Sequence, residues 1–131
     1  MESSFKTFED LACWKSAREL KNYAKEITKK FPNEEKYRLT DQIIRASRSV
    51  GANIAEGYGR FSFQENAKFC RDARGSLTET LHHMIDALDE NYINEEELNE
   101  FRKLYDKCLL ILNGYIAYLL KAKIENTTKP K

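Results

Sequence analysis

Hydrophobic residues recur at spacings of three and four along most of this 131-residue chain, a period that predicts amphipathic α-helices and not strands. The first helix is expected from Phe8 to Lys30, where Pro32 stops it. The second is expected from Lys36 to Glu56. Gly51 lies inside it at a cost of about 1 kcal/mol relative to Ala, which indicates a close approach by another helix.

Two further helices are marked by their first turns. Ser62 is a suitable N-cap for the third helix, with Glu65 three residues later in the position of a capping box, and Asn91 ends that helix. The fourth helix opens at Asn94, and the three glutamates that follow favour the positive end of its dipole.

Four helices of similar length with short connections predict an all-α fold, an antiparallel up-down-up-down four-helix bundle. Residues 1–124 are expected to form this single domain, and the polar residues 125–131 to be a disordered tail. Between Cys108 and Leu120 the fourth helix is apolar around most of its circumference, which predicts a second covering surface, a subunit interface. The residues assigned to that interface are Leu109, Leu112, Tyr115, Ile116 and Leu119.

Composition excludes several classes of protein. Three widely spaced cysteines, Cys13, Cys70 and Cys108, do not form a disulfide framework or a zinc knuckle, so buried reduced thiols are expected. The N-terminus lacks the apolar core of a secretory signal, and no apolar run is long enough to cross a membrane. A cytoplasmic protein without a membrane partner is therefore expected.

The net charge of +1 conceals an uneven distribution along the chain. Residues 36–75 carry a net charge of +4, residues 76–100 carry −8 without one Lys or Arg, and residues 101–131 carry +5. Helical spacing places several arginines on shared faces, from which a phosphate backbone could be bound. The candidate nucleic-acid contacts are Arg38, Arg45, Arg48, Arg71 and Arg74. The alternative is an ordinary solvated surface, partly neutralised by Asp41, Glu56, Glu65 and Asp72.

No arrangement in the sequence indicates catalysis, a metal or a cofactor. His82 and His83 are the only histidines, and adjacent helical positions diverge by about 100°, which argues against a shared metal. Glu79 and His82 match half of a di-iron motif, but the chain has no third histidine for the other half. Gly57 and Gly59 lack the third glycine of a phosphate-binding loop and indicate a helix end.

Several blocks of sequence resemble a known family. They are Phe8-Glu9-Asp10-Leu11, Trp14-Lys15, Phe31-Pro32, Leu39-Thr40-Asp41-Gln42-Ile43, Ala52-Asn53-Ile54-Ala55-Glu56-Gly57 and Ala73-Arg74-Gly75-Ser76-Leu77-Thr78-Glu79. Over residues 8–122 the chain resembles the bacterial four-helix bundle proteins encoded by intervening sequences of large-subunit ribosomal RNA genes. It is also similar to the accessory variability proteins of retroelements. It departs from the family pattern at Gly51, often proline there, and at Ser47-Arg48, where small apolar residues are common.

The resemblance implies a ring-like homopentamer that binds RNA or DNA through its arginines. It also implies a structural role for Asn53, Glu56, Gly57, Gly75, Ser76 and Glu79. The expected function is a non-catalytic, self-associating bundle that binds nucleic acid, RNA in preference to DNA, through an Arg-rich face. The alternative is a protein-interaction or scaffold module without a nucleic-acid role.

Overall fold

The computed structural model describes residues 7–128, with side chains described over residues 7–122. The elements are η1 (Phe8–Asp10), α1 (Ala12–Thr28), η2 (Asn33–Glu35), α2 (Leu39–Tyr58), α3 (Phe63–Asp89) and α4 (Glu95–Thr128). Over the described residues the chain contains no strand, and none of its helices is sufficiently long and hydrophobic to span a membrane. The predicted all-α four-helix fold is confirmed.

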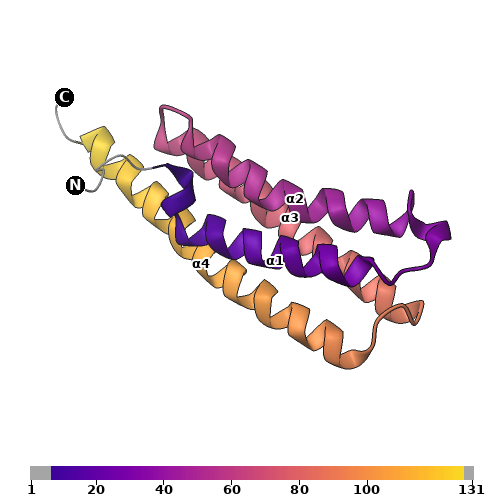
Figure 1. The fold of residues 1–131 in the computed structure, drawn as a ribbon. Coiled ribbons are helices and arrows are strands. Elements are labelled where there is room, and N and C mark those ends of the chain that lie inside the picture. The colour runs from indigo at the N-terminus through magenta and orange to yellow at the C-terminus, as the bar shows by residue number, and fades with distance from the viewer. Residues whose placement is uncertain (1–6, 129–131) are drawn as a thin grey trace, which may run out of the picture.

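The four helices form a ring in which each packs against two others: α1 and α3 both contact α2 and α4. Figure 1 shows the α1–α2 and α3–α4 connections at one end and the α2–α3 turn at the other, so the chain reverses direction at each connection. Hydrogen bonds between α3 and α4 agree with this, because Asn66 bonds to Tyr115 and Thr78 to Tyr105, with numbering that runs in opposite senses. Neighbouring helices are therefore antiparallel.

The apolar stripe of each helix faces the centre of this ring. The largest fully buried side chains come from all four helices: Leu20, Ile43, Val50, Ile54, Leu77, Met84, Phe101, Leu112 and Leu119. All three cysteines are free and buried in the same core, as the sequence predicted. Burial raises the pKa of Cys13 to about 12 and of Cys70 to about 11, so these thiols stay protonated.

The first two helices are shorter at their starts than predicted, and each difference has a local cause. Leu11 is extended (ψ 129°) and separates η1 from α1, which allows the Phe8 ring to pack against the edge of Trp14 at 5.1 Å. At the start of α2, the Glu35 carboxylate accepts a hydrogen bond from the Leu39 N–H, so the helix begins at Leu39 and not at Lys36.

Helix ends at the other two connections follow the predicted signals. The Ser62 hydroxyl accepts a hydrogen bond from the Glu65 N–H, the helix-capping half of the expected box. Asn94 and Glu97 form the reciprocal pair of bonds at the start of α4. Asn91 has φ of 63°, the left-handed conformation that ends α3.

Helix α4 continues to Thr128, beyond the boundary predicted at residue 124. No Gly or Pro occurs between Gly114 and Pro130, so nothing in the sequence stops the helix earlier. The last part of the predicted tail, residues 129–131, lies outside the described residues.

Candidate nucleic-acid interface

The structure distributes the five candidate arginines over several sides of the bundle. Arg38 is exposed at the start of α2, and Arg71 is exposed on α3. Arg74 points toward α4 and donates a hydrogen bond of 2.7 Å to the Asn113 side chain. Arg45 and Arg48, both on α2, lie in two different hollows, one against α3 and one against α1. The five arginines do not form one continuous surface.

Arg48 lies in a basic groove between α1 and α2 that the sequence analysis did not identify. This groove has a volume of about 90 Å³ and is lined by Lys21, Asn22, Lys25, Ile44, Ser47 and Arg48. Three of its six lining residues are cationic, and none is acidic. Among the residues that the structure describes, Lys21, Lys25 and Arg48 form no ion pair, so their charges remain available to an anionic partner.

The groove is basic because the acidic residues of α1 near it form ion pairs elsewhere. Glu19 pairs across to Lys107 of α4 at 3.0 Å, and Glu26 pairs with Lys29 at 2.9 Å. Lys21 and Lys25, four positions apart, both point toward α2. Arg18 lies on the same side, with its guanidinium 5.7 Å from the Trp14 ring centroid. Neither Glu19 nor Glu26 lines the groove, so the charge of Lys21 and Lys25 is not neutralised there.

The hollow on the other side of α2 differs in charge. It measures about 450 Å³ and contains Asp41 and Glu79 as well as Arg45. Arg45 approaches Asp41 at 3.9 Å. Because two carboxylates accompany its single arginine, this hollow is a weaker anion site than the basic groove.

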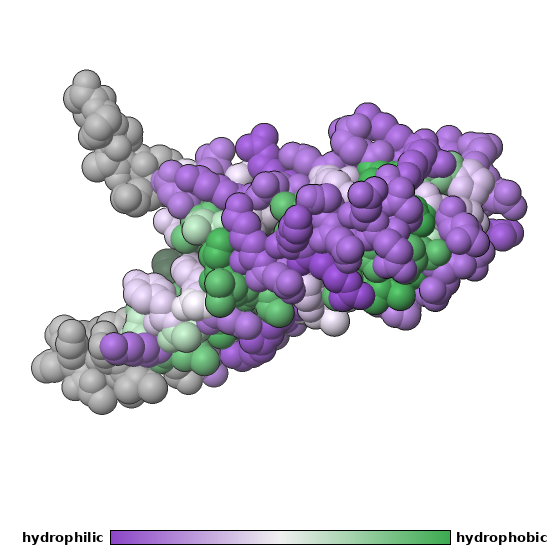
Figure 2. All heavy atoms as spheres, turned by 90° about the horizontal axis from the view of Figure 1, so that it is seen from below, coloured by the Kyte–Doolittle hydropathy of each residue, from purple (hydrophilic) through white to green (hydrophobic). Residues whose placement is uncertain are grey.

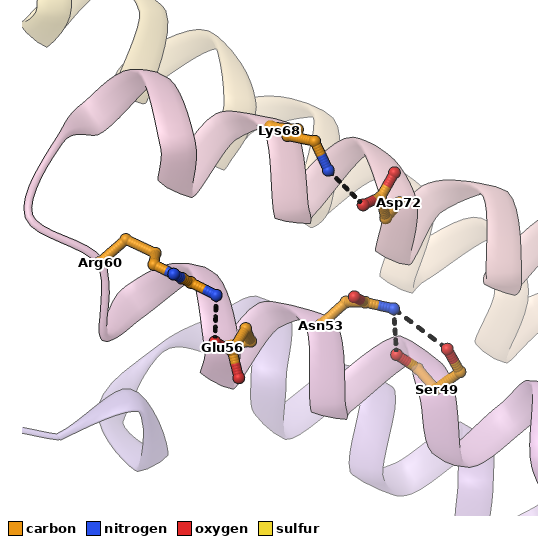
Figure 3. Close-up of polar contacts among 6 residues, drawn as sticks. All are labelled: Ser49, Asn53, Glu56, Arg60, Lys68 and Asp72. Atoms are coloured by element: carbon orange, nitrogen blue, oxygen red, sulfur yellow. Dashed lines mark hydrogen bonds and ion pairs between the residues drawn. The ribbon is translucent and has the colours of Figure 1, made fainter.

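The small residues of α2 and α3 have structural roles at the contact between these helices. Asn53 donates hydrogen bonds to the backbone and side chain of Ser49, and Ser76 of α3 donates one to the same Ser49 hydroxyl. Figure 3 shows the contacts between Asn53 and Ser49 with two ion pairs nearby, Glu56 with Arg60 on α2 and Lys68 with Asp72 on α3.

Of the glycines in α2 and α3, Gly57 is the one that the packing requires. Gly57 is buried inside α2, and a Cβ there would lie 2.7 Å from the Asn66 side-chain oxygen and 2.9 Å from the Asn66 backbone oxygen. The close approach predicted at Gly51 therefore occurs at Gly57, since a Cβ on Gly51 would meet Trp14 at an ordinary 3.4 Å. Gly75 has open space around its missing Cβ.

The predicted interface residues of α4 are mostly part of the core of the single chain. Leu112, Ile116 and Leu119 are buried, and Leu109 and Tyr115 are partly buried against the same core. These side chains need no second subunit to cover them. Among the side chains that the structure describes, the large apolar residues that α4 leaves exposed are Leu110 (76%), Tyr118 (59%) and Leu120 (39%). Figure 2 views the molecule from below relative to Figure 1, from the side where α4 lies. It shows hydrophobic side chains among the hydrophilic ones.

The fold and this surface define a class: an all-α four-helix bundle that carries a basic groove on one side and exposed apolar side chains on another. Residues 9–114 match the model of the 23S rRNA-intervening sequence protein family. The chain belongs to this family, as the resemblance in its sequence predicted. No curated protein sequence matches the chain at a significant level.

Proposed function

We propose that this protein binds nucleic acid, RNA in preference to DNA, and that it does so without catalysing a reaction. The observation that carries the proposal is the basic groove between α1 and α2, where Lys21, Lys25 and Arg48 face one hollow with no carboxylate in its lining. Cations of this kind bind phosphates by displacing condensed counterions. The family is named after an intervening sequence of 23S rRNA, which is the ground for preferring RNA.

The surroundings of the groove can extend this contact. Arg18, Lys21 and Lys25 follow one another at spacings of three and four, so they form a line of about 10 Å along α1. A phosphate backbone that runs along α1 would thus meet several cations in succession. Of the five arginines that the sequence nominated, Arg48 is the one that lines this groove. Arg45, in the α2–α3 hollow on the other side of α2, lies outside this line of cations.

The test is the salt dependence of affinity for a single-stranded RNA, measured by fluorescence anisotropy between 50 and 300 mM salt. Each phosphate neutralised contributes a slope of about −0.7 to a plot of log affinity against log salt for single strands. Replacing all three groove cations, Lys21→Gln with Lys25→Gln and Arg48→Gln, should reduce the magnitude of the slope by about 2 and weaken binding at 50 mM salt.

A matched control removes three positive charges elsewhere. Lys29, Lys103 and Lys107 are each already paired with a carboxylate, Glu26, Glu100 and Glu19 respectively. The triple change of these lysines to Gln alters the net charge by the same amount and should leave the slope close to that of the parent protein. Equal losses in both triple variants would mean that net charge, and not the groove, controls binding. No RNA binding by the parent protein would end the proposal.

A second candidate function, a protein-interaction module, is favoured by the exposed apolar residues Leu110 and Tyr118 on α4. In that case the binding of a protein partner would depend weakly on salt and strongly on these side chains. The two functions are compatible if the partner is a second copy of the chain, as in the homopentamer that the resemblance implies. We therefore include self-association through α4 in the proposal.

A further inference from the structure

A cluster of possible metal ligands lies on the C-terminal half of α3, away from the basic groove. One ligand atom from each of His82, His83 and Asp86 lies within 4.8 Å of the other two. The His83 ring nitrogen Nε2 is 3.3 Å from the Glu79 carboxylate, and the His82 Nε2 is 3.5 Å from that of Asp86. Four side chains with metal-binding groups thus gather within two turns of one helix.

The spacing along α3 explains this convergence. Glu79 with His83, and His82 with Asp86, are both i, i+4 pairs, which lie above one another on a helix. His82 and His83 leave the helix in different directions, but their rings meet edge to face with centroids 5.4 Å apart. Divergence at Cβ, on which the sequence argument against a shared metal depended, does not separate the ends of two long side chains.

A second observation concerns the buried ring nitrogen of His83. His83 is only 8% exposed, and its Nδ1 atom is buried without a hydrogen-bond partner in the described structure. A buried polar nitrogen that lacks a partner costs about 1–3 kcal/mol. If the His83 ring turns Nδ1 toward His82 and Asp86, coordination to a metal ion would satisfy this nitrogen while Glu79 holds Nε2. Metal-binding histidines commonly use their second nitrogen in this way.

The local charge also favours a cation. Residues 76–100 contain eight acidic residues and no Lys or Arg. Arg45, which shares a hollow with Glu79 across the α2–α3 contact, already approaches the Asp41 carboxylate at 3.9 Å. Imidazole with carboxylate suits Zn²⁺ and similar transition metals, whereas Mg²⁺ and Ca²⁺ prefer sites made of oxygen ligands alone.

We propose that His82, His83 and Asp86 bind one divalent transition-metal ion of the Zn²⁺ class, with Glu79 holding the ring of His83. At bond lengths of about 2.0–2.2 Å the donor atoms must approach to roughly 3–3.5 Å of one another. The two outer side chains have room for this movement, because His82 is 68% and Asp86 48% exposed. Three protein ligands leave a fourth position for water, as in zinc sites that stay open to solvent.

The experiment is a calorimetric titration of the full chain with Zn²⁺ alone, after treatment with a chelator. One ion per chain is expected. His82→Ala and Asp86→Asn should each weaken binding by at least tenfold, and Glu79→Gln by about 10–100-fold. Asp89→Asn, which removes an exposed carboxylate two turns from His82, is the matched control and should bind like the parent protein.

The buried cysteines must be separated from this site, since thiols also bind zinc. A Co²⁺ titration does so, because thiolate ligands would add a sulfur-to-cobalt charge-transfer band that a site of nitrogen and oxygen ligands lacks. The proposal is overturned if the parent protein binds no Zn²⁺, if the thiolate band appears, or if His82→Ala binds normally. A further result would overturn the three-ligand site: His82→Ala loses Zn²⁺ binding, while Glu79→Gln and His83→Asn both bind Zn²⁺ normally. The ion would then be held at the surface by His82 and Asp86 alone.

Discussion

At the scale of single residues, Gly57 determines how closely α2 and α3 can approach. Its missing Cβ is replaced by the backbone and side chain of Asn66, together with the Phe69 Cβ, which would lie 3.0 Å away. Asn66 is held from two sides, since it donates to the Tyr115 hydroxyl and accepts from the Cys70 thiol. A methyl group at Gly57 would therefore have to displace a fixed neighbour.

We expect Gly57→Ala to lower the free energy of unfolding by about 1–3 kcal/mol, the usual cost of overpacking a filled core. Gly75→Ala is the matched control, because it makes the same change inside α3 where no atom lies within 4 Å, and it should raise stability by about 1 kcal/mol. Urea denaturation followed by circular dichroism measures both. Equal effects of the two changes would show that α2 and α3 do not approach closely at Gly57.

At the scale of elements, Glu35 connects the start of α2 to the turn between α3 and α4. One carboxylate oxygen accepts a hydrogen bond from the Leu39 N–H at 3.2 Å, and the other accepts one from the Tyr92 hydroxyl at 2.7 Å. The bond from Tyr92, followed by that from Leu39, lowers the pKa of Glu35. The same bond to Glu35, chiefly, raises the pKa of Tyr92 to about 12.

The sign of the resulting pH dependence follows from these directions. A carboxyl group whose pKa is lowered by folding stabilises the native state above its ordinary pKa, 4.5, and this contribution is lost as the pH falls through the lowered value. Glu35→Gln should therefore lower the melting temperature at pH 7, and the difference from the parent protein should narrow below pH 4. Thermal melts at several pH values test this, with Glu34→Gln, an exposed neighbour, as the control. A difference independent of pH would refute the role of ionised Glu35.

The elements also show what a sequence pattern can specify. The apolar stripe of α1 was predicted because its period selects one face, and that face is buried from Ala17 to Ile27. The apolar residues of α4 occur on nearly all of its faces, so their spacing does not show which face is buried. The prediction therefore assigned buried residues such as Leu112 to an outer interface, whereas Leu110 and Tyr118, which it did not name, are exposed.

The basic groove escaped prediction for a related reason. The period of α1 shows that Lys21 and Lys25 share a side, but it does not show which helix lies beside them. Only the packing of α1 against α2 brings Arg48, distant in sequence, into the same hollow. The available signal on α1 was the spacing of four between Lys21 and Lys25. The prediction considered only arginines, on α2 and α3, and so did not include these lysines.

At the scale of the whole molecule, the separate surfaces have different requirements. The basic groove needs exposed, unpaired cations. The helices that carry these cations are held in place by the buried core of the bundle, so the cations are not needed for folding. The apolar side chains of Leu110 and Tyr118 on α4 gain nothing from exposure to water, and burying them against another copy would be favourable by about 25 cal/mol per Å² of apolar surface. Self-association would also repeat the basic groove on each copy, which multiplies weak contacts with one RNA.

We expect the protein to self-associate through α4, and Leu110→Gln with Tyr118→Gln to convert it to a single chain of 15.3 kDa. Both side chains are more than half exposed in the single chain, so the double change should alter its folding by little. Tyr37→Gln is the matched control: Tyr37 is 82% exposed but lies in the connection before α2, and its loss should leave the assembly intact. Light scattering at several protein concentrations measures the mass directly. A parent protein that remains a single chain at every concentration would remove self-association from the proposal, whereas RNA binding by that single chain would leave the role of the groove intact.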